Sequence, residues 1–189
     1  MSLVHSGNVA LKVEDRGSGE LPFLFVHGWA ADSTVWEPQM DDLSRSFRCV
    51  SVDLRGRGGS PVAHPCDVVT AAEDLAAVIR ELALGPVIVV GQDIGGLAAL
   101  VLNHQHTDLV TGVVTADAPI GAAPRVPADE DKLADRIRGA AGLGPAAGLV
   151  DSFFRPGTSP ELAERLRRMI EDCPVDVAAG MLEGHEFEG

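Results

Sequence analysis

Four β-branched residues run directly into a glycine-rich turn near the middle of the chain, and few folds accommodate this pattern. The run is Val87-Ile88-Val89-Val90 and the turn is Gly91-Gln92-Asp93-Ile94-Gly95-Gly96. The segment that follows, 94–104, has a helical pattern. Glycines on both sides of Asp93 indicate a tight bend that other backbone segments approach closely. The sequence therefore predicts a buried strand that turns abruptly into a helix and presents the Asp93 side chain.

Short apolar segments alternate with helical patterns along the first part of the chain. The expected strands lie at 9–13, 22–26, 48–52, 87–90 and 111–115, and the clearest helices at 70–84 and 94–104. Trp36 and Met40 stand four residues apart, which suggests one face of a further helix packed against the sheet. Such alternation is typical of a parallel sheet that helices cover on both faces. We predict an α/β fold with a doubly wound, mostly parallel sheet.

The composition changes after Pro119, where Ala122-Ala123-Pro124-Arg125-Val126-Pro127 indicates a linker. Beyond it the patterns are helical, at 129–141, 146–154, 159–171 and 175–183. Glycines between the first two patterns loosen that junction. We therefore expect two parts, a core formed by residues 1–120 and a helical lid or cap segment formed by residues 121–189.

Charge and cysteine content restrict the partners and the environment. The chain has 189 residues, and with 46% of them hydrophobic it can bury the core of one domain. A formal net charge of −13 argues against nucleic acid or an anionic membrane as a partner. Neither a signal peptide nor a membrane span is visible. Three cysteines without metal-type spacing suit the cytoplasm, and Cys49, within an expected strand, is expected to be plain core.

Asp93 occupies the position where a sharp strand-to-helix turn usually carries serine. A serine hydroxyl needs a histidine base before it becomes nucleophilic, whereas a carboxylate is ionised at neutral pH and attacks carbon directly. The attack joins enzyme and substrate through an ester. Asp93 therefore favours displacement of a halide or opening of an epoxide in a small-molecule substrate. Because a carboxylate and backbone donors suffice for this chemistry, no cofactor or metal is expected.

Two further motifs follow neighbouring strands. His27-Gly28-Trp29 comes directly after the strand at 22–26, and Asp53-Leu54-Arg55-Gly56-Arg57-Gly58-Gly59-Ser60 comes after the strand at 48–52. A carboxylate that ends a strand close to an arginine normally holds a loop together through charge-assisted hydrogen bonds. We interpret the second motif as scaffolding, and His27 as a structural turn residue that positions its loop.

In their order and positions, these three motifs resemble the α/β-hydrolase superfamily. The resemblance covers residues 10–120 well and residues 121–189 loosely, as the start of a helical lid. Asp93-Ile94-Gly95-Gly96 looks most like the haloalkane dehalogenase and epoxide hydrolase group, which uses an aspartate nucleophile. The resemblance implies that Asp93 is the nucleophile and that the backbone N–H groups of Trp29 and Ile94 form an oxyanion hole. His27, Gly28, Gly91 and Gly95 are then the structural residues near the site.

Asp117 and the histidines allow more than one interpretation. In some dehalogenases an acid at the position of Asp117 orients the catalytic histidine, and in other members an aspartate there shapes only the lid entrance. Both roles stay open. His104 and His106 stand two apart at a helix end, which is commoner for surface histidines than for a metal site. His185 is the only histidine in the final sixty residues and is expected to be exposed.

The chain departs from the family in three respects. The family has a histidine after its last strand that activates water. The sequence stops before the place where that histidine would come. We therefore expect the fold to be truncated at its C-terminal side, or to be completed by a partner segment. Ile94 stands where dehalogenases have a Trp that holds the halide, and the chain has no Tyr to polarise an epoxide. Besides a hydrolase, two alternatives therefore stay open: a non-catalytic homologue that binds a small molecule, and an inactivated esterase.

The strand at 111–115 predicts how the chain assembles. In the superfamily a further strand flanks this one, and the segment that would supply it is missing here. The strand carries no lysine, proline or inward charge that would protect an exposed edge. Because unpaired apolar edges recruit other chains, we expect a homodimer or larger homo-oligomer.

Overall fold

A six-stranded sheet forms the centre of the computed structural model, which describes residues 2–120, 134–135, 137–139, 142–143 and 154–182. The strands are β1 (Ser2–Ser6), β2 (Val9–Arg16), β3 (Phe23–Val26), β4 (Cys49–Val52), β5 (Val87–Gln92) and β6 (Val110–Ala116). Their order is β1-β2-β4-β3-β5-β6. The last four of these, from β4 to β6, run parallel, whereas β1 and β2 pair antiparallel. The predicted mostly parallel sheet is confirmed.

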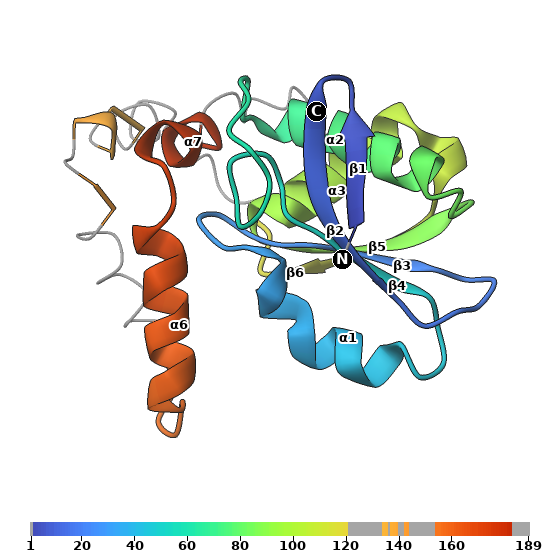
Figure 1. Ribbon diagram of the computed structural model, residues 1–189, viewed down its shortest axis with the longest axis horizontal. Coiled ribbons are helices and arrows are strands. Elements are labelled where there is room, and N and C mark those ends of the chain that lie inside the picture. The colour runs from blue at the N-terminus through green and yellow to red at the C-terminus, as the bar shows by residue number, and fades with distance from the viewer. Residues whose placement is uncertain (1, 121–133, 136, 140–141, 144–153, 183–189) are drawn as a thin grey trace.

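Helices cover both faces of this sheet (Figure 1). They are α1 (Glu37–Leu43), which follows the 3₁₀ turn Ser33–Trp36, together with α2 (Val68–Glu81) and α3 (Ile94–Gln105). In Figure 1, α1 lies on one face, and α2 and α3 lie on the other. The α2 helix begins before the predicted start because the Asp67 side chain accepts a hydrogen bond from the Thr70 N–H and caps the first turn.

The alternation of side chains along the strands divides the core into two layers. Leu24 and Val26 of β3 belong to the cluster beneath α2 and α3, whereas Phe25 belongs to the cluster beneath α1. That second cluster also holds Trp36, Met40 and Cys49. The predicted helix face of Trp36 and Met40 and the core position of Cys49 are therefore confirmed. Both layers fix the carboxyl ends of the parallel strands, where the motif residues gather.

β1 was not predicted from the sequence. Of its five residues only Val4 is buried, so its hydrophobic pattern is too short to identify a strand. Pairing explains its formation instead, because every residue from Ser2 to Ser6 faces a partner on β2 across the turn at Gly7 and Asn8. Gly7 has a φ of 57°, a left-handed conformation that glycine adopts without strain.

β6 forms the opposite edge of the sheet. It pairs with β5, and within the described residues no strand pairs with its other side. Val114 is 49% exposed there, and none of the seven residues of β6 is fully buried. The structure therefore shows an apolar strand at this edge, as the sequence predicts.

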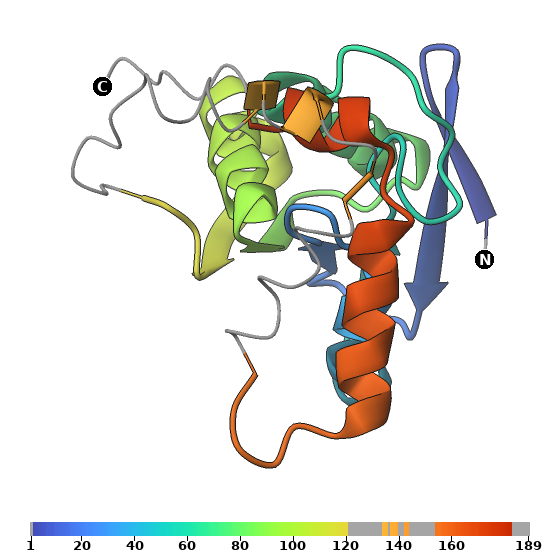
Figure 2. The ribbon, with the colours of Figure 1, turned by 90° about the vertical axis from the view of Figure 1, so that its left-hand side faces the viewer.

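Two C-terminal helices lie at the carboxyl ends of the strands (Figure 2). They are α6 (Pro160–Glu171) and α7 (Val175–Gly180). The indole N–H of Trp29 donates to the Ala178 carbonyl at 2.8 Å, which ties α7 to the loop after β3. The predicted helix at 129–141 is described only in part, and the one at 146–154 lies almost entirely outside the described residues. None of the helices in the described ranges is long and apolar enough to cross a bilayer.

Candidate active site

Asp93 sits on a strained turn between β5 and α3. Its backbone has φ 51° and ψ −123°, which lies outside both the helical and the extended regions for L-residues. The Asp93 N–H donates to the Ala116 carbonyl at 2.9 Å, and the Asp93 carbonyl accepts from the Gly96 N–H, also at 2.9 Å. Strain of this kind persists only where surrounding contacts hold it, and it clusters at functional sites.

The glycines around Asp93 are required by close backbone approach. A Cβ atom at Gly91 would collide with the backbone of Gly95, and one at Gly95 would collide with the carbonyl oxygens of Val26 and His27. At Gly28, a Cβ would lie 3.1 Å from the Asp93 Cβ. The bend thus packs directly against the loop after β3, which brings the two motifs together.

We predict that Gly95→Ala disrupts this packing. The added methyl group would meet two backbone oxygens closer than 3.0 Å, and neither can move without distorting β3. We expect a loss of about 2–4 kcal/mol in the free energy of unfolding, measured by urea denaturation. Gly112→Ala is the matched control, because a Cβ at Gly112 meets nothing within 4 Å. Equal stability of the two variants would contradict the close approach.

The Asp93 carboxylate already accepts a hydrogen bond from the loop after β3. The backbone N–H of Trp29 donates to Asp93 Oδ2 at 3.0 Å, although the two residues are 64 apart in the sequence. Among the described contacts, the Ile94 N–H makes no hydrogen bond to this carboxylate. The structure thus brings one of the two expected oxyanion donors onto one carboxylate oxygen and leaves the other oxygen, Oδ1, free of described hydrogen bonds.

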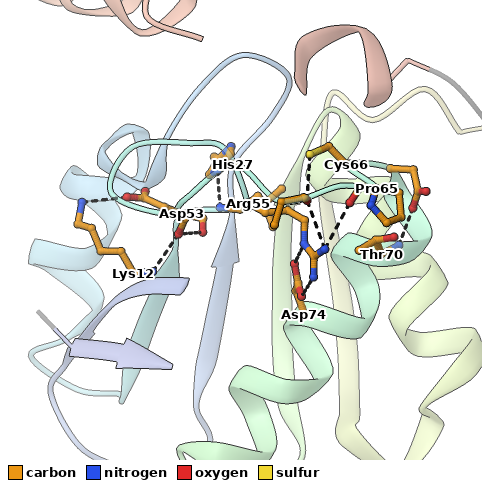
Figure 3. A network of polar contacts seen from close by, with 12 residues as sticks. Lys12, His27, Asp53, Arg55, Pro65, Cys66, Thr70 and Asp74 are labelled. Atoms are coloured by element: carbon orange, nitrogen blue, oxygen red, sulfur yellow. Dashed lines mark hydrogen bonds and ion pairs between the residues drawn. The ribbon is translucent and has the colours of Figure 1, made fainter. Parts of the chain in front are cut away.

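His27 is completely buried, and its ring is fixed by two backbone contacts (Figure 3). The Leu54 N–H donates to Nε2 at 3.0 Å, so the ring proton belongs on Nδ1, which lies 3.0 Å from the Gly28 carbonyl oxygen. Burial lowers the pKa of His27 to about 4. The ring is therefore neutral at pH 7 and joins the loops after β3 and β4, which is a structural role.

His27 makes stability depend on pH. Its folded pKa of about 4 lies below the ordinary value of 6.5, so the unfolded state binds the proton first. The contribution of neutral His27 to the free energy of unfolding is therefore complete above pH 6.5. It is lost as the pH falls towards 4, with a slope of about 1.4 kcal/mol per pH unit. We expect chemical denaturation of His27→Gln to show a shallower dependence over this range. Identical slopes for the two proteins would contradict this assignment.

Asp53 is the buried centre of the loop after β4 (Figure 3). Its carboxylate accepts hydrogen bonds from the Ser33 N–H at 2.8 Å, the Gly59 N–H at 2.8 Å and the Lys12 ammonium at 2.9 Å. Burial by itself raises the pKa of Asp53, but these donors together hold it below its ordinary value. The Ser60 hydroxyl donates to the Asp53 carbonyl, which closes the loop. These contacts are those of a scaffold, as the sequence predicts.

Arg55 pairs with an acid that the sequence did not single out. Its Nε and Nη2 atoms donate to the two carboxylate oxygens of Asp74, each at 2.7 Å, in the bidentate geometry seen in Figure 3. Asp74 lies on α2 and is completely buried. The one signal in the sequence was an acid on the predicted buried face of that helix. Lys12, which pairs with Asp53, gave no comparable signal.

Asp117 is exposed and lies next to Ala116, which accepts the Asp93 N–H. Its φ of 54° is unusual for a residue other than glycine. No hydrogen bond to a histidine is found for Asp117 within the described part of the chain. Its two possible roles therefore remain predictions.

The described histidines are engaged away from Asp93. His64 lies 2.9 Å from Asp176, and His106 lies 3.0 Å from Glu73, while His104 is exposed. His185 falls outside the described residues. In the part of the chain that the structure describes, no three histidine, cysteine or acidic side chains gather into a possible metal site. A water-activating histidine is thus not among the described groups around Asp93.

A family comparison agrees with this geometry. The family model described as alpha/beta hydrolase fold matches residues 22–179. The chain belongs to this family. The match spans the loop after β3, the loop after β4, the strained turn at Asp93 and the C-terminal helices. The α/β-hydrolase fold is thereby confirmed.

Individual relatives within the family differ in activity. The chain is 38% identical over 115 residues to 2-(acetamidomethylene)succinate hydrolase of Mesorhizobium japonicum, covering 60% of this chain and 41% of that protein. It is 33% identical over 99 residues to epoxide hydrolase 3 of Xenopus tropicalis, covering 51% and 27%. The chain thus spans less than half of the length of these relatives.

Among solved structures, an esterase from Thermogutta terrifontis, described with malate bound, has a similar fold. It superposes with a TM-score of 0.82 at 29% identity, covering 96% of this chain and 70% of the esterase. The similarity extends over nearly all of this chain and therefore includes both the sheet and the C-terminal helices.

Proposed function

We propose that this chain is a hydrolase in which Asp93 attacks an electrophilic carbon of a small organic substrate. The observation that carries the proposal is the hydrogen bond from the Trp29 N–H to Asp93 Oδ2, on a turn where the Asp93 side chain does not cap the helix that follows. A carboxylate needs one oxygen for attack and a donor for the other. The arrangement supplies both.

The chemistry follows from these two oxygens. Oδ1 uses an electron pair to bond the substrate carbon, and the bond from that carbon to halide or epoxide oxygen breaks with its electrons. Oδ2 becomes the carbonyl oxygen of the ester and stays beside the Trp29 N–H. Water then attacks the Asp93 carboxyl carbon, and negative charge develops on Oδ2, where a preorganised donor stabilises it. The bond from that carbon to Oδ1 then breaks, the alcohol product leaves with Oδ1 and a proton from the water, and Asp93 keeps the oxygen of the water. In this proposal, the Ile94 N–H serves as the second donor in that step.

The substrate class that we favour is an epoxide. The family includes a relative named as an epoxide hydrolase, which is the reason for this choice. The chain has neither a Tyr to polarise an epoxide oxygen nor, at Ile94, the Trp N–H that would hold a leaving halide. Relatives named as esterases also occur, but an ionised carboxylate attacks a saturated carbon more productively than an ester carbonyl. An epoxide is therefore the first substrate to test, with a haloalkane second.

Mass spectrometry of the intact protein tests this proposal. Incubation with a panel of short epoxides, haloalkanes and p-nitrophenyl esters should give an alkyl adduct on the peptide that contains Asp93. Because no described histidine contacts Asp93, we expect ester formation to exceed ester hydrolysis. An acyl adduct on another residue would favour esterase chemistry. The lack of any adduct would favour a non-catalytic small-molecule binder.

We also propose that the chain forms a homo-oligomer through β6. The exposed apolar edge with Val114 supports this, because such an edge pairs readily with a second copy. We expect light scattering to show a dimer or larger species, and Val114→Lys to shift it towards the monomer. Leu3→Lys, on the opposite edge strand β1 and 58% exposed, is the matched control. A monomeric wild-type protein at micromolar concentration would contradict the proposal.

The cytoplasmic location remains a proposal, supported by three free cysteines.

A further inference from the structure

Arg57, in the loop after β4, is a buried cation that forms no ion pair with an acid among the described residues. Arg57 is only 3% exposed. None of its three guanidinium nitrogens makes a hydrogen bond within the described residues. Burial lowers the pKa of Arg57, but a guanidinium stays protonated in proteins. A positive charge with five donors is thus held out of water, which is strongly unfavourable unless an anion pairs with it.

The neighbouring Arg55 shows how the same loop accommodates an arginine that serves the fold. Arg55 makes two hydrogen bonds of 2.7 Å to Asp74, which neutralises its charge and satisfies its donors. Arg57 lies two residues further, and no described acid makes such hydrogen bonds to it. The loop can therefore hold an arginine whose donors are satisfied, and the lack of a described acceptor is particular to Arg57.

Nearby groups do not replace an anion. The Cys173 side chain lies close enough to Arg57 to act on it through its charge and as a weak hydrogen-bond partner, but burial raises the pKa of Cys173, so the thiol stays neutral at pH 7 and supplies no counter-charge. Asp32 acts on Arg57 only through its charge, because its Oδ1 atom accepts hydrogen bonds from the N–H and the hydroxyl of Thr34. The described residues therefore leave the buried guanidinium nitrogens of Arg57 without a hydrogen-bond acceptor.

Arg57 lies in the wall of a cavity of about 850 Å³. The loop at 31–34 and the loop at 56–62 form one side, and α6 with the residues before α7 forms the other. Figure 2 shows α6 running along the molecule with α7 above it. From α6, Arg165 adds a second guanidinium whose buried Nε lacks a partner while its Nη1 pairs with Glu37 at 3.1 Å. Residues with buried donors that have no acceptor among the described residues therefore stand in both walls of the cavity.

We propose that this cavity binds the carboxylate group of a small organic acid, with Arg57 as its bidentate partner. A planar guanidinium fork matches the two oxygens of a carboxylate. A single negative charge is favoured over a multiply charged anion such as phosphate, because the charged residues lining the cavity are three arginines and four acids that repel further negative charge (Arg57, Arg165, Arg168, Asp32, Glu161, Glu164 and Asp172). Val62 and Met169 in the same wall provide contacts for the organic part of the ligand.

This site is separate from the strained turn. Neither Asp93 nor Trp29 nor Ile94 belongs to the described cavity wall. The proposal therefore does not rest on the proposed function, and Asp93→Asn is expected to bind the acid as the wild type does. A failure of one proposal leaves the other intact.

Calorimetric titration of the 189-residue chain with hexanoate tests the inference. Hexan-1-ol is the neutral comparison of similar length, and inorganic phosphate is the multiply charged comparison. We expect saturable binding of hexanoate and much weaker binding of the other two. Arg57→Met should weaken hexanoate binding about ten- to a hundredfold, the effect of a lost hydrogen-bonded charge pair. Arg57→Lys should fall between, because it keeps the charge and loses the fork.

A stability measurement separates binding from a purely structural role. Without ligand, Arg57→Met should raise the unfolding midpoint by about 2–4 °C, because it removes an unpaired buried charge. Arg45→Gln, at an exposed position paired only with Asp42, is the control and should change neither property. Absent hexanoate binding by the wild type, equal binding by Arg57→Met, or tighter binding of phosphate or hexan-1-ol would each overturn the proposal.

Discussion

Asp93→Asn is expected to abolish covalent capture of an epoxide, with a loss of at least ~10⁴-fold in the rate of adduct formation. The amide keeps the shape of the side chain and an oxygen that accepts the Trp29 N–H. It lacks the negative charge that makes the carboxylate nucleophilic. Asparagine also tolerates a positive φ better than most residues, so the turn with φ 51° is expected to form normally. Mass spectrometry of samples quenched at successive times measures this rate.

Two controls make this result specific. Gln92→Ala changes an exposed neighbour on the same turn and should leave the rate of adduct formation within about threefold of wild type. Circular dichroism and the unfolding midpoint of Asp93→Asn should match those of the wild type. Adduct formation by a folded Asp93→Asn at a rate near that of the wild type would exclude Asp93 as the nucleophile.

Asp53→Ala is expected to cause the largest loss of stability among single substitutions in the three motifs, about 3–5 kcal/mol. The change leaves the Lys12 ammonium and the N–H groups of Ser33 and Gly59 without their acceptor. Desolvated donors of this kind cost more when orphaned than the same bonds contribute when made. Urea denaturation measures the effect.

An exposed acid provides the control for Asp53. Asp108→Ala, at an exposed position before β6, should change the free energy of unfolding by less than about 0.5 kcal/mol. If Asp53→Ala were as mild as Asp108→Ala, the Asp53 contacts would not hold the loop after β4, and their interpretation as scaffolding would be wrong.

Sequence reasoning succeeds here where local pattern and chain direction determine the outcome. The run at Val87–Val90 and the glycines after it predicted the strand, the bend and the helix. The resemblance to the α/β-hydrolase superfamily implied that the Trp29 N–H lies near Asp93, and the structure gives 3.0 Å between the Trp29 nitrogen and Asp93 Oδ2. The fold class therefore follows from periodicity, whereas the position of the candidate site rests on the three motifs and on the family resemblance.

Sequence reasoning fails where a contact depends on how elements that are distant in the sequence pack together. The pairing of Arg55 with Asp74 requires the rotation of α2 about its axis, which a hydrophobic pattern fixes only roughly. The pairing of Lys12 with Asp53 depends on β2 lying antiparallel beside β4, and neither strand specifies its neighbour by itself. Sequence reasoning also could not predict that the Arg57 guanidinium has no hydrogen-bond partner among the described residues, because this depends on which side chains surround it in the folded protein.

The most direct test of the central proposal follows the oxygen atom that reaches the product. The protein is reacted with an epoxide in water enriched in oxygen-18, and the Asp93 peptide and the diol product are analysed by mass spectrometry. If Asp93 is the nucleophile, the first diol carries oxygen from the carboxylate. Oxygen-18 then appears in the Asp93 side chain, or the peptide retains the alkyl group where the ester persists. Oxygen-18 in the diol from the first turnover, with an unmodified Asp93 peptide, would contradict the proposal.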